Sequence, residues 1–219
     1  MFVGHYAAAL AAKAVEPRAP LWTFVGACQL MDIGWGALIM AGIERARVNP
    51  ALPGSTLDLY FMPFTHSLPG ALVLSAAAAF AAMALLKLPA RAGLLIGAVV
   101  FSHWLLDLLV HRPDLALWIN GPEVGFGLWN YPLAEMALEL GLVAVAGAIL
   151  TAQRKSSGRT AWPVVIFLAI LTAVQMLSSS TPNTEDTMST GGLALVVYLS
   201  ITAIAWLVDL RRRPVPASH

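Results

Sequence analysis

The sequence predicts an all-α membrane protein, a polytopic helical bundle with six to seven transmembrane helices. Of its 219 residues, 58% are hydrophobic and 11% are charged, and the mean hydropathy is +0.74. A soluble domain is roughly 45–50% apolar and about 25% charged, so a chain this apolar cannot cover its surface in water. Apolar segments of about 20 residues, the length that crosses a bilayer, recur along the chain.

Six segments have a spanning length, and a shorter apolar stretch precedes them. Their predicted bounds are Pro20–Ile43, Met62–Leu86, Arg91–His111, Tyr131–Ala152, Ala161–Ser178 and Gly192–Leu210. Several starts carry a proline, which lacks the N–H that a first helical turn leaves unpaired: Pro20, Pro63, Pro132 and Pro163. The preceding stretch, Phe2–Val15, would reach only about 20 Å as a helix, so it either spans thinly or lies partly in the interface.

The basic residues predict the orientation of these helices. If the Arg211–Arg213 tail is cytoplasmic and the helices alternate, ten of the 13 basic residues lie inside: Lys13, Arg18, Lys87, Arg91, Arg154, Lys155, Arg159 and the tail itself. The exceptions are Arg45, Arg47 and Arg112. The N-terminus is then outside and the C-terminus inside. We expect one domain, in which residues 1–152 form a metal-site bundle with an outer loop at 112–130, and residues 153–219 supply two scaffold helices and the basic cytoplasmic tail.

Charge and cysteine content exclude several classes of protein. The net charge is +1, which excludes a nucleic-acid binder that works by neutralising phosphates. The single cysteine, Cys28, excludes an internal disulfide and a cysteine-rich zinc site. The first residues lack a basic region before the apolar stretch, so no cleavable signal peptide is expected.

Ionisable residues inside the apolar segments are costly and therefore suggest function. His103 and Asp107 are four residues apart and share one helix face, and His111 follows at the same spacing. Asp32 and His66 lie in two other predicted helices, and further members of the set are His5, Glu135 and Glu139. In the predicted orientation these residues converge on the outer half of the bilayer. The joint set predicts a site that binds a metal or handles protons.

Each of these residues also has a structural interpretation when it is taken alone. A lone histidine such as His5 is usually an interhelical hydrogen-bond partner, and Asp32 can accept hydrogen bonds from neighbouring helices. His66 can cap its helix, and His111 can lie at the lipid headgroups. Glu135 in a first helical turn is favoured by the helix dipole.

As a metal site, the set offers histidine and carboxylate ligands without thiolates, which suits zinc, manganese or iron. We expect His5, Asp32, His66, His103 and Asp107 to hold one or two divalent ions, with zinc the first candidate. An open coordination position would let the metal activate a water molecule, and Glu135 and His111 are the candidates for proton transfer.

The stretch from Arg112 to Asn130 is rich in Gly, Pro and Trp and lies over the predicted site. It predicts a lid or a lipid-facing substrate entrance, where Arg112 binds an anionic headgroup and Trp129 contacts substrate. The alternative is an aromatic belt in which Trp118 and Trp129 rest at the headgroups.

Several short motifs together resemble one family of bacterial inner-membrane proteins. They are M-F-V-G-H-Y at 1–6, A-A-K at 11–13, the Asp32 segment, F-T-H-S-L at 64–68, S-H-W-L-L-D at 102–107, H-R-P-D at 111–114 and G-L-W-N at 127–130. This pattern is similar to the YdjM-type group, described as membrane-bound metal-dependent hydrolases. The resemblance covers about residues 1–140 and implies a multi-pass protein of the bacterial inner membrane.

The order of the ligands also resembles that of the zinc-dependent phospholipase C and S1/P1 nuclease group, which cleaves phosphoesters at a zinc cluster. By that resemblance Asp32, His66, His103 and Asp107 would hold one metal, and His5 would help to hold a second beside Asp107. The chain lacks the group's later His-x-x-x-Asp/Glu pair and offers only Glu135 and Glu139. It also begins with methionine, where the soluble enzymes use a processed tryptophan as a ligand. One or two metals are therefore expected.

These observations favour a hydrolase of a lipid ester or phosphoester, with membrane lipids as its partners. The alternative is a transporter, or an ion- or proton-handling protein, that uses the same buried residues. A third interpretation is an assembly factor with a structural metal. The apolar inner halves of the predicted helices favour the enzyme, because a pathway must cross the whole membrane. Substrate, metal identity and oligomeric state stay open.

Overall fold

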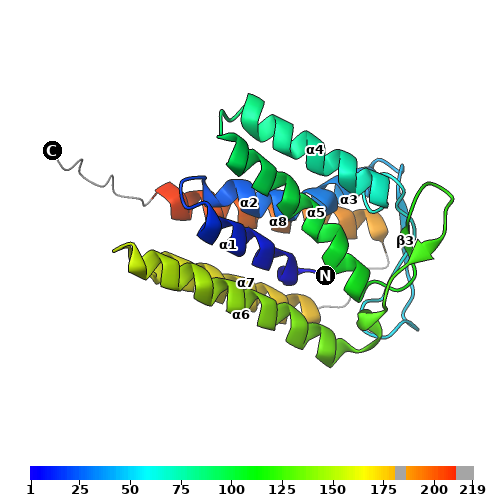
Figure 1. Cartoon of the computed structure of the whole chain (residues 1–219). Coiled ribbons are helices and arrows are strands. Elements are labelled where there is room, and N and C mark those ends of the chain that lie inside the picture. Colours follow the sequence, from blue (N-terminus) through cyan, green and yellow to red (C-terminus); the bar gives the residue numbers. More distant parts are fainter. Residues whose placement is uncertain (181–185, 211–219) are drawn as a thin grey trace.

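The computed structural model describes residues 1–180 and 186–210 and shows a bundle of antiparallel helices with two small β-hairpins at one end (Figure 1). The Arg211–Arg213 tail lies outside the described residues. The elements, in chain order, are η1 (Val3–His5), α1 (Tyr6–Val15), α2 (Leu21–Cys28), α3 (Leu30–Met40), β1 (Arg45–Val48), β2 (Leu57–Phe61), α4 (Leu68–Ala84), α5 (Ala90–Val110), β3 (Leu115–Ala116), β4 (Glu123–Val124), η2 (Leu128–Asn130), α6 (Pro132–Ser156), α7 (Trp162–Ser180) and α8 (Thr187–Leu210).

Within the described residues, four helices are long and apolar enough to cross a membrane: α5, α6, α7 and α8. The pair α2 and α3 makes a fifth span if its two parts, bent by 51°, count as one. The prediction of six to seven spans is therefore wrong, although the mainly helical architecture is confirmed and the length and composition of these helices indicate a membrane protein.

Two predicted segments account for the difference in the number of spans. The N-terminal stretch folds into η1 and the 10-residue α1, which is too short to cross a bilayer. The segment predicted from Met62 begins its helix only at Leu68, because residues before it form a turn and Ser67 caps the helix by accepting from the Gly70 N–H at 3.1 Å. The resulting α4 has 17 residues.

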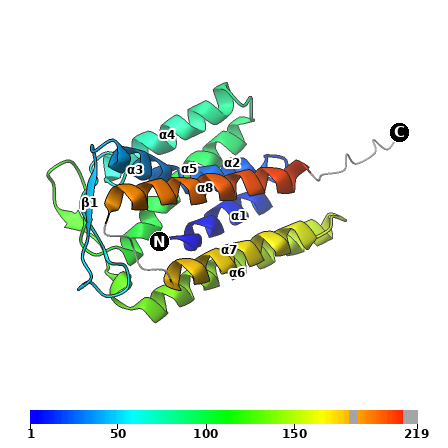
Figure 2. The same ribbon diagram turned by 180° about the vertical axis from the view of Figure 1, so that it is seen from behind.

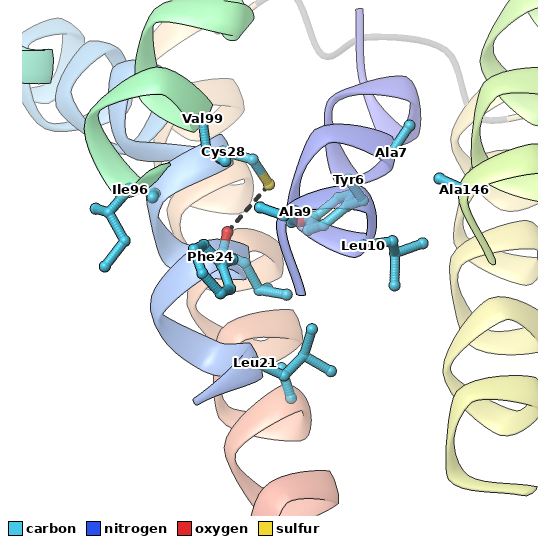
Figure 3. Packing of buried hydrophobic residues seen from close by; sticks show 14 of the residues in the cluster. Tyr6, Ala7, Ala9, Leu10, Leu21, Phe24, Cys28, Ile96, Val99 and Ala146 are labelled. Carbon is cyan, nitrogen blue, oxygen red and sulfur yellow. Dashed lines mark hydrogen bonds between the residues drawn. The ribbon is translucent and has the colours of Figure 1, made fainter. Parts of the chain in front are cut away.

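The bundle is built around the short first helix. Figure 1 shows α1 in its interior, with α6 and α7 along one side and α4 and α5 along the other. Seen from behind, α8 runs along α2 and α3 (Figure 2). The side chains of Tyr6 and Leu10 on α1 are fully buried against Phe24 of α2 and neighbours from α5 and α6 (Figure 3). Helix α1 is thus sequestered by protein rather than by lipid.

The break between α2 and α3 occurs at Gln29, whose backbone leaves the helical conformation. Its side-chain Nε2 donates to the Phe2 carbonyl at 3.2 Å, which ties the break to the N-terminal turn. The last carbonyls of a helix have no partner within it. At this break, the Cys28 carbonyl is consequently available to a side chain from another helix.

The predicted outer loop, residues 112–130, contains the β3–β4 hairpin and the η2 turn. Arg112 connects it to the other hairpin, since its guanidinium donates to the Ser55 and Pro53 carbonyls and to Asn130 Oδ1 at 3.0 Å. Both hairpins lie at the same end of the bundle (Figure 1).

Candidate metal centre

Asp107 on α5 lies at the centre of the candidate site and is almost fully buried. Its Oδ1 is 3.1 Å from His5 Nε2 and 3.5 Å from His111 Nε2, and its Oδ2 is 3.1 Å from His103 Nε2 and 3.6 Å from His66 Nε2. The Met1 amino group also donates to Oδ1, at 2.8 Å. One carboxylate thus faces four imidazoles.

Asp32 supplies the second carboxylate, from the first turn of α3 just after the helix break. Its Oδ1 is 3.3 Å from His66 Nε2 and 3.5 Å from His103 Nε2. With 13% of its side chain exposed, Asp32 is less buried than the histidines it faces.

Three segments position the four histidines around these carboxylates. His103 and His111 are one helical turn before and after Asp107, so the face predicted from the sequence is the face that carries the site. His66 precedes α4, and its carbonyl accepts from Trp104 Nε1 at 3.1 Å. His5 ends the η1 turn, and its ring stacks on that of His103 at 3.6 Å between centroids.

Three of the histidines have Nδ1 bound to a neighbouring oxygen. His103 Nδ1 is 2.7 Å from the Cys28 carbonyl, His111 Nδ1 is 2.8 Å from Asp114 Oδ1, and His66 Nδ1 is 2.8 Å from Thr65 Oγ1. A carbonyl or carboxylate oxygen can only accept, so Nδ1 of His103 and of His111 carries the proton. In the neutral ring Nε2 then keeps its lone pair, and each Nε2 points at a carboxylate. Metal-binding histidines show this arrangement.

Several buried nitrogen atoms in this cluster lack a hydrogen-bond partner among the described residues. They are both ring nitrogens of His5 and Nε2 of His103. His5 Nε2 is close to Asp107 but outside hydrogen-bonding geometry. Burial lowers the pKa of His5 to about 4, so its ring is neutral at physiological pH. Imidazole nitrogens that face carboxylate oxygens in a dry interior need a cation between them, either a proton or a metal ion.

Two groups of three ligand atoms are close enough to hold an ion, with all atoms of a group within 4.8 Å of one another. One comprises His5, His103 and Asp107, and the other comprises Asp32, His66 and His103. All five residues expected as metal ligands therefore come together, and His103 belongs to both groups.

The predicted proton-transfer residues lie at the edge of this cluster. His111 belongs to neither group and packs against Trp129 with the two rings tilted, at 4.0 Å between ring centroids. Glu135 lies in the first turn of α6, one helical turn before Glu139. Glu139 is fully buried and accepts from the backbone N–H groups of Phe2 at 2.9 Å and Gly4 at 2.8 Å. It anchors the turn that carries His5.

The two residues expected to bind substrate have different surroundings. Trp129 covers His111, which places it beside the site. Arg112 borders a surface hollow of about 240 Å³ that Asp58, Asp114 and Glu123 also line. Its bonds to the β1–β2 hairpin and to the η2 turn give it a structural role.

Sequence reasoning missed the oxygen atoms that orient the histidines. Asp114 follows His111 by three residues, a spacing that could have indicated the contact, and Thr65 is adjacent to His66. No sequence pattern indicates the Cys28 carbonyl, since it becomes available only through the break in the helix.

No protein-family model, curated protein or solved structure matches this chain.

Proposed function

We propose that the protein is a membrane-embedded, divalent-metal-dependent hydrolase of a lipid ester or phosphoester. The observation that supports this most strongly is the common orientation of His66, His103 and His111. Each has Nδ1 bound to an oxygen and Nε2 within 3.6 Å of Asp107, and His66 and His103 also face Asp32.

Asp32, His66 and His103 would hold an ion in one position, and His5, His103 and Asp107 would hold an ion in an overlapping one. His103 Nε2 has a single lone pair, so it would bind an ion in only one of the two positions at a time. Histidine and carboxylate donors without thiolates suit zinc, which is our first candidate. A bound zinc ion supplies a hydroxide nucleophile near neutral pH by lowering the pKa of its water to about 7.

His111 is the proposed proton-transfer residue. Asp114 fixes its Nδ1–H at 2.8 Å and leaves Nε2 facing the cluster, as a carboxylate does for a general-base histidine. Trp129 packs on the ring and limits its movement. Glu135 is the proposed second proton carrier, one helical turn from the buried Glu139.

A lipid substrate is proposed because the site lies among membrane-spanning helices and the described chain folds as one bundle, with no separate domain to recruit a polar substrate. An ion pathway is disfavoured by the interior beyond the cluster, where Tyr6, Leu10, Phe24, Ile96 and Val99 pack together (Figure 3).

We propose that the protein resides in the bacterial inner membrane, with the hairpins and the N-terminus outside and the C-terminus inside. Among the described residues, the end opposite the hairpins carries most of the basic side chains, including Arg18, Arg91 and Arg159, which line one hollow there. The positive-inside rule assigns such an end to the cytoplasm.

Cysteine labelling tests this orientation. The native Cys28 is buried and should give no background. In intact cells, an impermeant thiol reagent is expected to label a cysteine at Glu123→Cys, in the β3–β4 hairpin, and to label one at Ser157→Cys only after the cells are opened. Both positions are exposed in the structure. Labelling of Ser157→Cys from outside would reverse the proposed topology.

The activity is tested with zinc-loaded protein in lipid nanodiscs that contain a panel of phospholipids, with headgroup and fatty-acid release measured separately. The wild-type protein should release either a headgroup or a fatty acid, and a chelator should stop the release. His111→Gln should keep its metal and lose activity by about 10²- to 10⁴-fold, the usual contribution of a general acid or base. Glu123→Gln, on the exposed hairpin, is the control. Hydrolysis that persists in the chelator would refute the proposal.

A further inference from the structure

Glu44 is a buried carboxylate that is neither a proposed metal ligand nor a proposed proton carrier. It follows α3, and only 1% of the residue is exposed. Its Oε1 accepts from the backbone N–H groups of Phe64 and Thr65, both at 2.9 Å, and its Oε2 accepts from the Thr65 hydroxyl at 2.6 Å. The same hydroxyl is 2.8 Å from His66 Nδ1. A continuous chain of hydrogen bonds therefore runs from Glu44 through Thr65 to His66.

The direction of these hydrogen bonds follows from the number of protons available. A carboxylate can only accept, so the single hydroxyl proton of Thr65 is donated to Glu44. The hydroxyl oxygen can then only accept from His66, which places the ring proton on Nδ1. His66 Nε2 is left with its lone pair, at 3.3 Å from Asp32 and 3.6 Å from Asp107.

We propose that Glu44, acting through Thr65, is a positioning residue that selects the Nδ1–H form of His66 and so prepares Nε2 to bind a metal ion. This inference rests on the proposed function, because it deepens the role of one ligand. Partners that hold the second ring nitrogen of a ligating histidine typically change metal affinity by about 10- to 100-fold when they are lost.

A purely structural role for Glu44 is the competing explanation, since its bonds to Phe64 and Thr65 also stabilise the turn before α4. Thr65 separates the two roles. Thr65→Val keeps the methyl group that packs near Gly34 and the backbone N–H bound by Glu44, but removes the hydroxyl. Thr65→Ser keeps the hydroxyl and removes the methyl group.

Glu44→Gln reverses the chain of hydrogen bonds without emptying the site. The amide oxygen can still accept from the backbone, while the amide NH₂ now donates to the Thr65 hydroxyl. The hydroxyl proton then turns toward His66 Nδ1, which moves the ring proton to Nε2 and blocks that atom as a ligand. Ser67→Ala is the matched control, because Ser67 caps the same turn but has no bond to His66 in the structure.

The test has two readouts, made on the full-length protein in detergent. The first is the ¹⁵N NMR signature of His66 without metal, which should show an unprotonated Nε2 in the wild type and in Thr65→Ser and a protonated Nε2 in Glu44→Gln. The second is zinc affinity, which should fall by about 10- to 100-fold in Thr65→Val and Glu44→Gln, and remain near wild type in Thr65→Ser and Ser67→Ala.

Equal zinc affinities for Thr65→Val and Thr65→Ser, or an unchanged tautomer in Glu44→Gln, would overturn the inference. The NMR readout needs no metal, so it also separates this inference from the proposed function. A wild-type protein that shows the expected tautomer but fails to bind zinc would contradict the metal site and the role of Nε2 as a zinc ligand. The finding that Glu44 controls the tautomer of His66 would then stand alone.

Discussion

Asp107→Asn is expected to abolish metal binding and activity, with the largest effect of any single substitution in the site. The carboxylate oxygens lie 3.1–3.6 Å from the Nε2 atoms of His5, His66, His103 and His111. Asparagine fills nearly the same volume but carries no charge and offers one acceptor oxygen in place of two. Loss of a neighbouring group that only orients a ligand costs about 10- to 100-fold, so the loss of this central ligand should exceed that range.

The comparison for this variant is Asp114→Asn, which leaves the central carboxylate intact. Asp114 contacts only His111 within the cluster, so its variant should keep the metal and lose part of the activity. Metal content, thermal stability and hydrolysis are measured for both variants in the same detergent. Asp107→Asn protein that keeps its metal and activity would show that Asp107 is not the central metal ligand.

Glu139→Ala is expected to cause the largest loss of stability among the residues near the site. Its two oxygens bind the N–H groups of Phe2 and Gly4 in a fully buried position. A buried donor left unpaired costs about 1–3 kcal/mol, which applies to the Gly4 N–H, and the partly buried Phe2 N–H adds a smaller loss. Release of the η1 turn should also withdraw His5 from Asp107 and weaken the metal position that includes His5.

Thermal unfolding in detergent, with and without zinc, measures this effect. Glu139→Gln should lie between the wild type and Glu139→Ala, because the amide retains one acceptor oxygen, and it should damage activity less than Asp107→Asn does. Leu133→Ala, on the exposed surface of α6, is the control. A melting temperature for Glu139→Ala equal to that of the wild type would contradict the anchoring role.

The residues that meet at the site were predictable because their signal is local or chemical. The spacing of His103 and Asp107 places them on one helix face. An ionisable residue such as Asp32 or His66 in an apolar segment costs free energy, so its presence there indicates a functional site. Helix positions were likewise readable, as in the segment predicted from Arg91 and observed from Ala90.

The number of spans and the groups that orient the histidines depend on contacts that form only in the folded chain. Hydropathy does not distinguish a helix buried in protein from one buried in lipid, which is why the short stretch that becomes α1 entered the count of spans. The break at Gln29 exposes a backbone carbonyl to His103, and no side-chain pattern records it. Glu44 lies 21 residues before Thr65, and both strands of the β1–β2 hairpin lie between them in the chain.

The metal content of the purified protein shows most directly whether the His/Asp cluster binds a divalent metal. The protein is isolated without chelators, and its metals are quantified by mass spectrometry against a His103→Ala variant, since His103 belongs to both candidate groups. We predict one or two divalent ions for each wild-type chain, with zinc the main metal, and a marked loss in the variant. Folded wild-type protein that carries no more divalent metal than His103→Ala, and gains none when zinc is supplied, would show that the His/Asp cluster is not a metal site.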